Sequence, residues 1–265
     1  MTQGPDWRTH FRPDIPSAAR VYDYLLGGKD NYPVDREVAR SMISKLPNVR
    51  IAVQWNRAYL RRVVRYLVGE AGIRQIIDVG AGLPSEGNTH EVALDAAADT
   101  HVVYVDHDPV VLAHGRDMLQ GLENTAIVKR DLFEPESILS DPDLAEHIDF
   151  AKPVAVMLLS MLHFVPDEED PAGIIKRLLA PFPSGSQVAI SHGTPFAVSE
   201  VERDFAKATQ QLHVRTPEEI GKLVDGLELV SPGLVWLPEW RPDPDTELPE
   251  DVTQAYYYAV VARKP

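Results

Sequence analysis

Two carboxylates and a glycine turn lie where short apolar runs of the sequence end. Asp78 closes the first of these runs, and Gly80-Ala81-Gly82 follows it. Glycines at this spacing let the backbone turn sharply and approach a ligand closely. Asp106 ends the next apolar run, where an acidic side chain can bind both hydroxyls of a ribose. The order of these residues predicts a site for a ligand that contains a nucleoside.

The turn differs from a dinucleotide-binding loop, because Ser85, preceded by Pro84, stands where the third glycine belongs. There is no Gly-x-x-x-x-Gly-Lys loop either. The next helix should begin with a capping box of Asn88 and Glu91. S-adenosylmethionine has a carboxylate, an amine and a ribose but no phosphate, so we expect it, and its product S-adenosylhomocysteine, rather than NAD. A glycine turn in a nucleotide-free α/β domain is the structural alternative.

Three histidines that follow strand-like runs are candidates for chemistry. His163 lies after the fourth run and His192 after the fifth, so each could face a transferable methyl group as a general base. Packing in the core or beside the cofactor is the alternative for both. His107 follows Asp106 and is expected beside the adenine. We expect no metal, because the chain has no cysteine and no His or Asp pair shows a metal-ligand spacing.

A cluster of polar and aromatic side chains precedes the first strand-like run. It consists of Arg20, Tyr22, Tyr24, Lys29, Asn31 and Tyr32. The sheet can form without these residues, so we expect them to make a lid over cofactor and substrate. Arg20 and Tyr22 are assigned to the cofactor, and the other four to the lid and the substrate. Helix capping and surface packing are the alternative.

The elements that must position these residues follow a regular alternation. Three helices are expected first, at residues 17–26, 35–45 and 51–69. Five short apolar runs then alternate with helical stretches, at Gln75–Val79, Val102–Val105, Thr125–Val128, Pro153–Leu159 and Gln187–Ile190. This alternation is typical of βα units in a parallel sheet. Leu227–Val235 and Ala255–Ala262 are strand-like with no helix between them, so they should pair antiparallel.

Composition excludes several classes of protein. The formal net charge of −14 argues against a nucleic-acid-binding surface. No window approaches the roughly 20 apolar residues of a membrane-spanning helix, and the first residues lack the apolar core of a signal peptide. We therefore expect a cytoplasmic protein without a membrane or nucleic-acid partner. The length of 265 residues fits one large α/β domain.

Several segments resemble motifs of class I methyltransferases. Asp78-Val79-Gly80-Ala81-Gly82 looks like motif I, and Val103-Tyr104-Val105-Asp106 resembles motif II. Lys129-Arg130-Asp131-Leu132 is similar to the motif whose acid meets the adenine amino group, so the resemblance assigns Arg130, Asp131 and Leu132 to the cofactor. Ser160, which follows the fourth run, is assigned to the same site. The stretch around His163 resembles the Leu-His-Asp-Trp stretch of small-molecule O-methyltransferases, although Phe164 and Val165 replace its Asp and Trp.

Almost the whole chain also resembles a narrower family, the bacterial S-adenosyl methyltransferases called DUF574. The matching segments are residues 15–32, 82–85, 87–93, 105–109 and 256–265. The fold expected is a Rossmann-like class I methyltransferase sandwich. Its sheet should have seven strands in the order 3-2-1-4-5-7-6, with the last strand antiparallel. Residues 1–70 are expected to form an arm and helical cap, and residues 71–265 the cofactor-binding domain.

The function expected is methyl transfer from S-adenosylmethionine to a small molecule. No Asn-Pro-Pro-Tyr or Asp-Pro-Pro-Tyr follows the fourth run, which argues against methylation of adenine or glutamine. Trp236, Trp240, Phe196 and the tyrosines could line an acceptor pocket or belong to the core. The alternative is a module that binds the cofactor without turnover, and a substrate-sized pocket beside the methyl group would favour the enzyme. The acceptor and the oligomeric state are left open.

Overall fold

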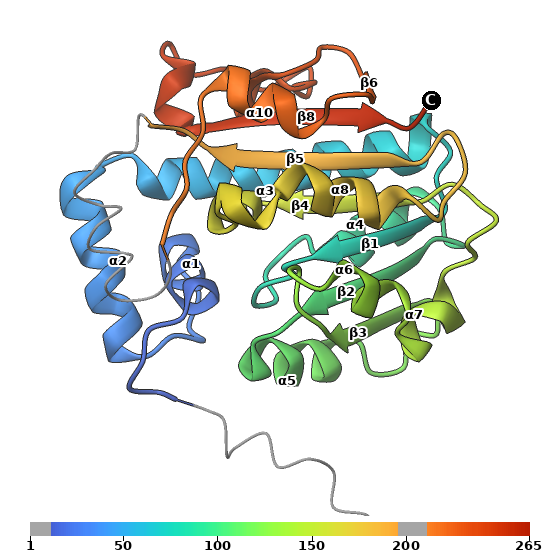
Figure 1. The fold of residues 1–265 in the computed structure, drawn as a ribbon. Coiled ribbons are helices and arrows are strands. Elements are labelled where there is room, and N and C mark those ends of the chain that lie inside the picture. The colour runs from blue at the N-terminus through green and yellow to red at the C-terminus, as the bar shows by residue number, and fades with distance from the viewer. Residues whose placement is uncertain (1–11, 196–210) are drawn as a thin grey trace, which may run out of the picture.

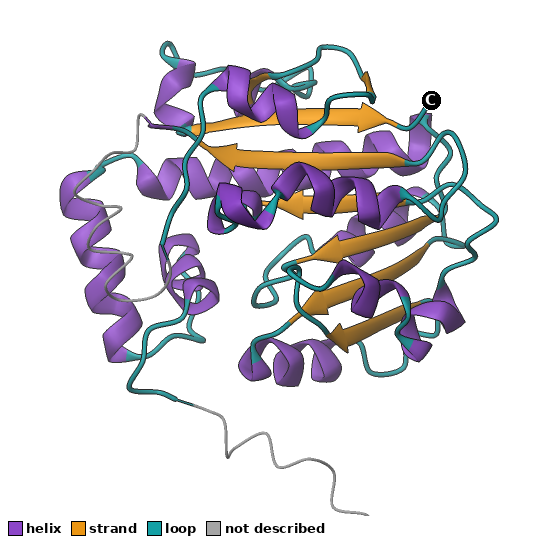
Figure 2. Ribbon diagram, viewed as in Figure 1, coloured by secondary structure: helices purple, strands orange, loops and turns teal. Residues whose placement is uncertain are grey.

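A sheet with five parallel strands forms the centre of the computed structural model, which describes residues 12–195 and 211–265 (Figures 1 and 2). The parallel strands lie side by side in the order β3-β2-β1-β4-β5. Their bounds are β1 (Gln75–Val79), β2 (His101–Asp106), β3 (Thr125–Lys129), β4 (Ala155–Leu159) and β5 (Gln187–Gly193). All five runs predicted from the sequence are thus confirmed as strands.

These strands are apolar on both faces because helices cover both sides of the sheet. β1 and β5 are buried along their whole length. In the register, Ile77 of β1 lies between Val103 of β2 and Val156 of β4. Strands in this environment read as continuous apolar runs rather than as alternating patterns, which explains why the sequence marks them clearly.

An antiparallel strand closes the far side of the sheet. β8 (Tyr257–Arg263) pairs with β5 on one side and with the short strand β6 (Glu228–Leu229) on the other. The sheet order is therefore β3-β2-β1-β4-β5-β8-β6. This arrangement confirms the predicted order and the antiparallel direction of the last strand.

The predicted strand Leu227–Val235 is wrong in its extent. The chain forms two short strands instead, β6 and β7 (Val235–Trp236), and both pair with β8. Pro232 has no N–H to donate to a ladder, and Gly233 has a φ of +91°, so the chain turns between the two strands. The sheet therefore has eight strands rather than seven.

Helices cover both faces of the sheet, so that the fold has three layers (Figures 1 and 2). α3 (Val49–Arg65) and α4 (Thr89–Ala96) pack on one face, where Tyr59, Val63 and Ile76 share a core. The opposite core includes Ile138, Leu144 and Ile174. The helices that supply it are α6 (Pro135–Leu139), α7 (Pro142–His147), α8 (Pro171–Leu179) and α10 (Pro217–Leu223). α5 (Pro109–Met118) packs against β3.

The first two helices lie beyond the carboxyl ends of the parallel strands (Figure 1). α1 (Ala18–Leu26) and α2 (Pro33–Lys45) form a small core of their own with the start of α3, through residues such as Val21, Leu25 and Val53. The three predicted N-terminal helices are confirmed, and the third continues as a π-helical turn, Tyr66–Glu70. α3 packs on both the cap and the sheet, and the domain boundary at residue 70 stays a prediction.

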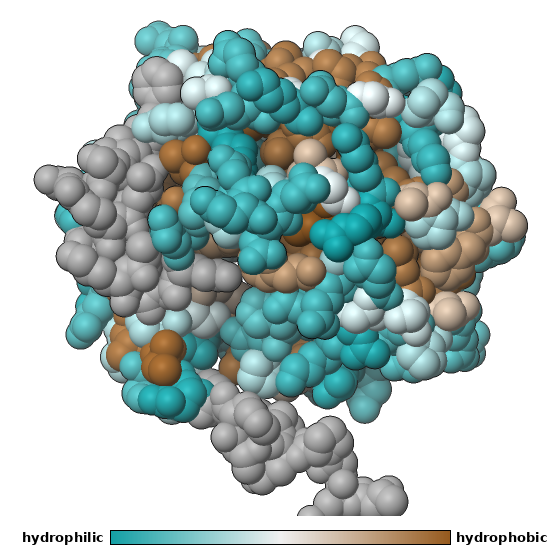
Figure 3. Space-filling model, in the orientation of Figure 1, coloured by the Kyte–Doolittle hydropathy of each residue, from teal (hydrophilic) through white to brown (hydrophobic). Residues whose placement is uncertain are grey.

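The surface seen in Figure 3 is mainly hydrophilic, and its hydrophobic side chains appear in separate groups. Among the described residues, the exposed large hydrophobic ones are Ile15, Tyr32, Ile51, Leu122, Leu229 and Leu248, which are scattered along the chain. Within the described ranges, no helix combines the length and the apolar character that crossing a membrane requires.

Candidate functional site

The turn after β1 has a conformation that favours glycine at two positions. Gly80 has a φ of +78° and Gly82 a φ of +66°, which L side chains rarely adopt. A Cβ at Gly80 would also lie 2.0 Å from the Met161 sulfur. The Gly80 N–H donates to the Val105 carbonyl at 2.8 Å, which ties the turn to the end of β2. The turn therefore brings backbone close to both Asp106 and the segment after β4.

Asp106 is fixed at the end of β2 by backbone donors. Its carboxylate accepts hydrogen bonds from the Gly82 N–H at 3.0 Å and the Asp108 N–H at 2.9 Å. Burial raises the pKa of Asp106, and these two backbone hydrogen bonds oppose the rise. A carboxylate has about four acceptor positions, so Asp106 can accept further hydrogen bonds from a ligand.

Asp78 is buried beside the glycine turn. Its Oδ2 accepts a hydrogen bond at 2.6 Å from Thr89 Oγ1, in the first turn of α4. Burial raises the pKa of Asp78 to about 6, while the Thr89 hydrogen bond and the charge of Arg57 lower it. The predicted capping box of Asn88 and Glu91 is confirmed, so that α4 begins beside this carboxylate.

A cavity of about 430 Å³ opens at the carboxyl edge of the sheet. Its walls come from the glycine turn, the end of β2, the segment after β4 and the cap helices α1 to α3. The sequence-predicted site residues on its wall are Tyr22, Asp78, Gly80, Ala81, Gly82, Asp106, His107, Ser160 and His163. Residues distant in the sequence thus meet at the edge where ligands of parallel α/β sheets bind.

Carboxylates dominate the charged groups of this cavity. Asp23 and Asp108 line it together with Asp78 and Asp106. Arg57 is the only arginine or lysine among the described residues of the wall, and its guanidinium donates to the carbonyls of residues 86 and 87 at 3.1 and 2.9 Å. The cavity is therefore suited to a ligand that carries positive charge.

A hydrogen-bond network around Asn56 crosses the cavity wall. Asn56 Nδ2 donates to the Tyr22 hydroxyl and to Ser160 Oγ, each at 2.9 Å. Asn56 Oδ1 accepts from Ser191 Oγ at 2.6 Å, and the Tyr257 hydroxyl is hydrogen bonded to Ser160. The network holds Ser160 at a φ of +57°, a conformation that is uncommon for residues other than glycine. It joins the cap to β4, β5 and β8.

Sequence reasoning missed Asn56 as a site residue. It lies on the buried stripe of α3 between Val53 and Leu60. A polar residue at a position where helical periodicity requires an apolar one is a signal that could have identified it. Ser191, Arg57 and Asp108 were missed too, because nothing in their local sequence distinguishes them from surface or strand residues.

Arg20 lies outside the cavity wall and holds the cap together. Its Nε forms an ion pair at 2.8 Å with Asp35, and both side chains are almost fully buried. Asp35 also accepts from the Ser17 N–H at 3.0 Å and the Tyr32 N–H at 2.8 Å. The expected contact between Arg20 and the cofactor carboxylate has no support in this geometry, because its partner Asp35 lies in α2.

The other predicted lid residues also lie away from the cavity wall. Tyr24 lies under the guanidinium of Arg50, and Lys29 is exposed. Asn31 Nδ2 donates to Asp23 at 2.8 Å. Tyr32 lies beside Arg20. Of the whole N-terminal cluster, Tyr22 is the member that lines the cavity, although Asn31 contacts the wall residue Asp23.

Residues 130–132, which follow β3, are not among the residues that line the cavity, although the Arg130 N–H donates to the carbonyl of the wall residue Asp106 at 3.2 Å. Arg130 pairs with Asp141 at 2.6 Å, and Asp131 accepts from the Phe133 N–H at 3.1 Å. Leu132 is buried in the core of the α8 face. The side chains of these three residues thus have partners outside the cavity wall, and their assignment to the cofactor stays a prediction.

The two candidate histidines have different environments. His163 is buried on the cavity wall, and the Gly193 N–H approaches its Nδ1 at 3.5 Å. His192 is fully buried and does not line the cavity. Its Nδ1 bonds the Gly193 carbonyl at 2.7 Å, and Arg215 donates to its Nε2 at 3.0 Å. Because both ring nitrogens are engaged, the geometry argues against His192 as a general base.

Both predicted tryptophans lie outside the cavity wall. Trp240 is fully buried and meets Tyr59 edge to face, with ring centroids 5.3 Å apart. Trp236 stacks on Tyr258 at 4.0 Å. Phe196 lies outside the described residues. Among the tyrosines, Tyr256 and Tyr257 line the cavity together with Tyr22.

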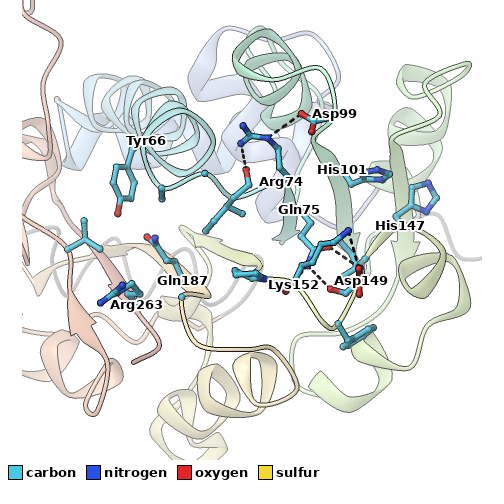
Figure 4. Close-up of a pocket in the computed structure, with 18 of the residues that line it drawn as sticks. Tyr66, Arg74, Gln75, Asp99, His101, His147, Asp149, Lys152, Gln187 and Arg263 are labelled. Atoms are coloured by element: carbon cyan, nitrogen blue, oxygen red, sulfur yellow. Dashed lines mark hydrogen bonds and ion pairs between the residues drawn. The ribbon is translucent and has the colours of Figure 1, made fainter.

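A larger hollow, of about 1220 Å³, lies at the opposite end of the sheet (Figure 4). Gln75, His101 and Gln187, each the first residue of a strand, line it. Its cations are paired with neighbouring acids: Arg74 with Asp99, Lys152 with Asp149, and Arg263 with Glu228. Of the sequence-predicted candidates among the described residues, only Tyr66, one of the tyrosines considered for an acceptor pocket, lines this hollow. Among the described residues, no group of three or more His, Asp or Glu side chains could hold a metal ion.

Comparisons with known proteins agree with this geometry. Residues 7–265 match the model of a family described as S-adenosyl methyltransferase. A DUF574 family protein from Streptomyces avermitilis MA-4680 is 40% identical, with a TM-score of 0.92 over 96% of this chain and 100% of its own. A proposed methyltransferase from Thermobifida fusca YX is 38% identical, with a TM-score of 0.87 over 94% of this chain and 95% of its own. No curated protein matches this chain.

A more distant structure shares the fold alone. The N-methyltransferase NodS from Bradyrhizobium japonicum WM9, in complex with S-adenosyl-L-homocysteine, is 11% identical to this chain. The TM-score is 0.50, over 93% of this chain and 99% of NodS. The expected class I methyltransferase architecture is thus confirmed.

Proposed function

The chain belongs to the S-adenosyl methyltransferase family and is an S-adenosylmethionine-dependent methyltransferase; on this premise we propose that the cavity at the carboxyl edge of the sheet holds the cofactor and a small apolar acceptor. When bound, the cofactor supplies a methyl group on a cationic sulfonium. The observation that carries the proposal is a single cavity whose lining combines four carboxylates and a glycine turn with many apolar side chains of the cap helices.

The carboxylates fit the charges of the cofactor. We assign Asp106 to the ribose hydroxyls, because its position at the end of β2 leaves acceptor capacity toward the cavity. His107 is the candidate neighbour of the adenine. Asp78 and the glycine turn would meet the amino acid portion, whose ammonium favours a carboxylate partner. Ser160 and Tyr22 would border the same portion from the side of the cap.

The apolar wall supports a small apolar acceptor. It consists of Val21, Leu25, Leu26, Met42, Leu46, Val49 and Val53 from the cap helices, together with Phe164, Leu212 and Val214. Most of the lining of a small-molecule site is hydrophobic, and a few polar groups orient the ligand. Holding acceptor and methyl in line can supply about 7–11 kcal/mol of the barrier reduction in favourable cases.

The apolar extension of the cavity favours an enzyme over a module that only binds the cofactor. A binding module needs no apolar space beside the groups that hold the cofactor. In this chain the cap helices enclose such a space and Tyr22 links them to the cofactor end through Asn56. We therefore favour an enzyme that transfers the methyl group over a module that only binds the cofactor.

The proposal is tested by calorimetric titration followed by an acceptor screen. Micromolar-range affinity for S-adenosylmethionine and S-adenosylhomocysteine, with much weaker affinity for NAD, is expected. Incubation with methyl-labelled cofactor and a panel of apolar small molecules should then label at least one acceptor. Tighter binding of NAD would overturn the cofactor assignment, and cofactor binding without transfer to any acceptor class would favour the binding module.

A further inference from the structure

Gly193 carries a backbone N–H that the sheet does not satisfy. The Thr194 N–H donates to Tyr256 at 3.0 Å, and in the antiparallel ladder Gly193 lies opposite Tyr257. Consecutive residues of a strand direct their N–H groups to opposite sides, so the Gly193 N–H points away from β8. On that side β4 has already ended, at Leu159. The N–H therefore needs an acceptor from the segment that follows β4.

The acceptor available to this N–H is the ring of His163. Its Nδ1 lies 3.5 Å from the Gly193 nitrogen, and a Cβ at Gly193 would lie 3.7 Å from the same atom. Buried backbone N–H groups in native proteins are almost always paired. A neutral imidazole that accepts through Nδ1 carries its proton on Nε2. Nε2 has no hydrogen-bond partner among the described residues. It is also absent from the set of fully buried side-chain atoms that lack a partner.

The surroundings of His163 keep the ring neutral. His192 from β5, Tyr257 from β8 and Phe164 contact it with ring centroids 5.8, 5.9 and 4.5 Å away. The pKa of His163 lies well below its usual value because of burial first, and then because of the charges of His192 and Arg215. The His213 N–H donates to the His163 carbonyl at 2.7 Å, so the segment that precedes α10 contributes backbone there.

The acids of the cavity lie toward β2 and α5. Asp106 is the last residue of β2, and Asp108 is the N-cap of α5. Asp23 interacts electrostatically with Asp30 and with His114 of α5. Asp78 is hydrogen bonded to Thr89 at the start of α4. Burial raises the pKa values of Tyr257, whose ring contacts His163, and of Tyr22, which lines the same cavity, so both hydroxyls stay protonated. No described residue beside His163 is thus placed to take a proton from an acceptor.

Resting on the function proposed above, we propose that His163 presents an Nε2–H to the acceptor and that the enzyme methylates an atom that carries no proton at neutral pH. Carboxylate oxygens and heteroaromatic nitrogens have this property, whereas alcohols and simple phenols do not. A lone pair of the acceptor forms the new bond to the methyl carbon, and the pair of the broken carbon–sulfur bond stays on sulfur. The step releases no proton, so it needs no general base.

The first test measures the ring directly, without cofactor or acceptor. In protein labelled with ¹⁵N-histidine, ring nitrogen shifts distinguish protonated from unprotonated nitrogens, and His163→Gln identifies the His163 signals by their loss. We expect a neutral ring with the proton on Nε2 from pH 6 to pH 8. A proton on Nδ1, or titration within this range, would overturn the inference. Failure to bind S-adenosylmethionine would instead overturn the proposed function.

The second test separates a donor from a base. Glutamine keeps an N–H near the Nε2 position but cannot take up a proton, and leucine removes both abilities. With benzoates and quinolines as acceptors, His163→Gln should keep the rate within about threefold, and His163→Leu should lose at least about tenfold. Loss of 10²–10⁴ in both variants, the contribution of a general base, would refute the proposal. Labelling of phenols and benzyl alcohols alone would refute it as well.

The control is His147→Gln, which makes the same replacement in the hollow at the other end of the sheet. It should leave both the rate and the His163 signals unchanged. Thermal unfolding of each variant shows whether the cavity remains folded.

Discussion

At the scale of single residues, the site depends on carboxylates whose partners are backbone N–H groups and hydroxyls rather than cations. Asp106 accepts from two backbone N–H groups, and Asp78 accepts from Thr89. The sequence identified both residues by their position at strand ends. Their neighbours in the network, such as Asn56, became visible only in the folded chain.

Asp106→Asn should weaken the binding of S-adenosylmethionine by about 1.5–3 kcal/mol, because hydrogen bonds to a charged group in a buried site contribute about that much. Asp131→Asn is the matched control, since Asp131 also follows a strand but lies outside the cavity wall. Calorimetric titration of both variants measures the difference. Equal affinities would show that Asp106 does not hold the ribose.

Asp78 should make the stability of the cofactor-free protein depend on pH. Its pKa is raised to about 6 in the fold, above the usual value of about 3.9. The native state therefore binds the extra proton between these values, and the free energy of unfolding falls as pH rises from about 4 to about 6. Asp78→Asn should remove this slope and raise the free energy of unfolding at pH 7 by roughly 1–3 kcal/mol.

Urea unfolding of both proteins at pH 4.5 and pH 7.5 measures this effect. The stability difference between Asp78→Asn and the unmodified protein should be larger at pH 7.5. A difference that does not change with pH would mean that the Asp78 carboxyl titrates normally in the fold.

At the scale of elements, a buried ion pair helps to hold the cap together, and Tyr22 and Ser17 link the cap to the site, because Ser17 Oγ donates to the wall residue Asp108 at 2.8 Å. Arg20 and Asp35 clamp α1 to the start of α2, where Asp35 also accepts two backbone N–H groups. Tyr22, two residues further along α1, contacts Asn56 at the cavity. One helix thus has a structural face and a face directed to the ligand.

Arg20→Ala should destabilise the protein by about 3–5 kcal/mol, because it leaves the buried Asp35 carboxylate without its cation. Arg40→Ala, at an exposed position of α2, should change stability by less than about 0.5 kcal/mol. Denaturant unfolding provides both values. If Arg20→Ala lost cofactor affinity without losing stability, the prediction that Arg20 contacts the cofactor would be supported.

Tyr22→Phe and Tyr24→Phe form a matched pair on the same helix. Removing the Tyr22 hydroxyl takes one acceptor from the buried Asn56 amide, so S-adenosylmethionine should bind about 5- to 30-fold more weakly. Tyr24 lies under Arg50, away from the cavity wall, and its loss of a hydroxyl should leave the affinity unchanged. Similar losses in both variants would mean that the cap acts as a whole rather than through Tyr22.

At the scale of the whole molecule, two hollows open at opposite ends of the sheet, and the candidate site lies in the smaller one. The larger hollow has paired cations, but Gln187 Oε1 and His101 Nδ1 in its wall have no partner among the described residues. Volume alone would therefore select the end opposite to the candidate site. The carboxyl end carries the glycine turn and the strand-end acids because loops after parallel strands converge there.

S-adenosylmethionine at 100 times its dissociation constant should stabilise the fold by about 2.7 kcal/mol. Hydrogen exchange should slow in α1, in the turn after β1 and in residues 160–163. Exchange around Gln187 and His101 at the opposite end should slow no more than the global stabilisation requires. If slower hydrogen exchange were confined to the residues around Gln187 and His101, the cofactor would have to bind in the larger hollow.

The features that the sequence determined by itself are those encoded by neighbours along the chain. Parallel strands buried on both faces appear as apolar runs, and glycines with positive φ appear as a turn between a strand and a helix. Asn88 and Glu91 form their capping box across three residues. The strand order and the antiparallel final strand followed from the number and kind of these elements and from the family resemblance.

Only the tertiary structure decided which side chains meet. Asn56 forms hydrogen bonds with Ser160 and Ser191, which are 104 and 135 residues away in the sequence. Arg215 is hydrogen bonded both to His192 and to the Leu162 carbonyl in the segment after β4. Arg20, Asp131 and His192 have residue types and sequence positions that suit a role in the site. In the structure, however, each is hydrogen bonded or ion-paired to groups outside the cavity. Local spacing specifies where a backbone turns, whereas the partner of a buried polar group depends on which elements pack together and on the need to satisfy every buried donor and acceptor.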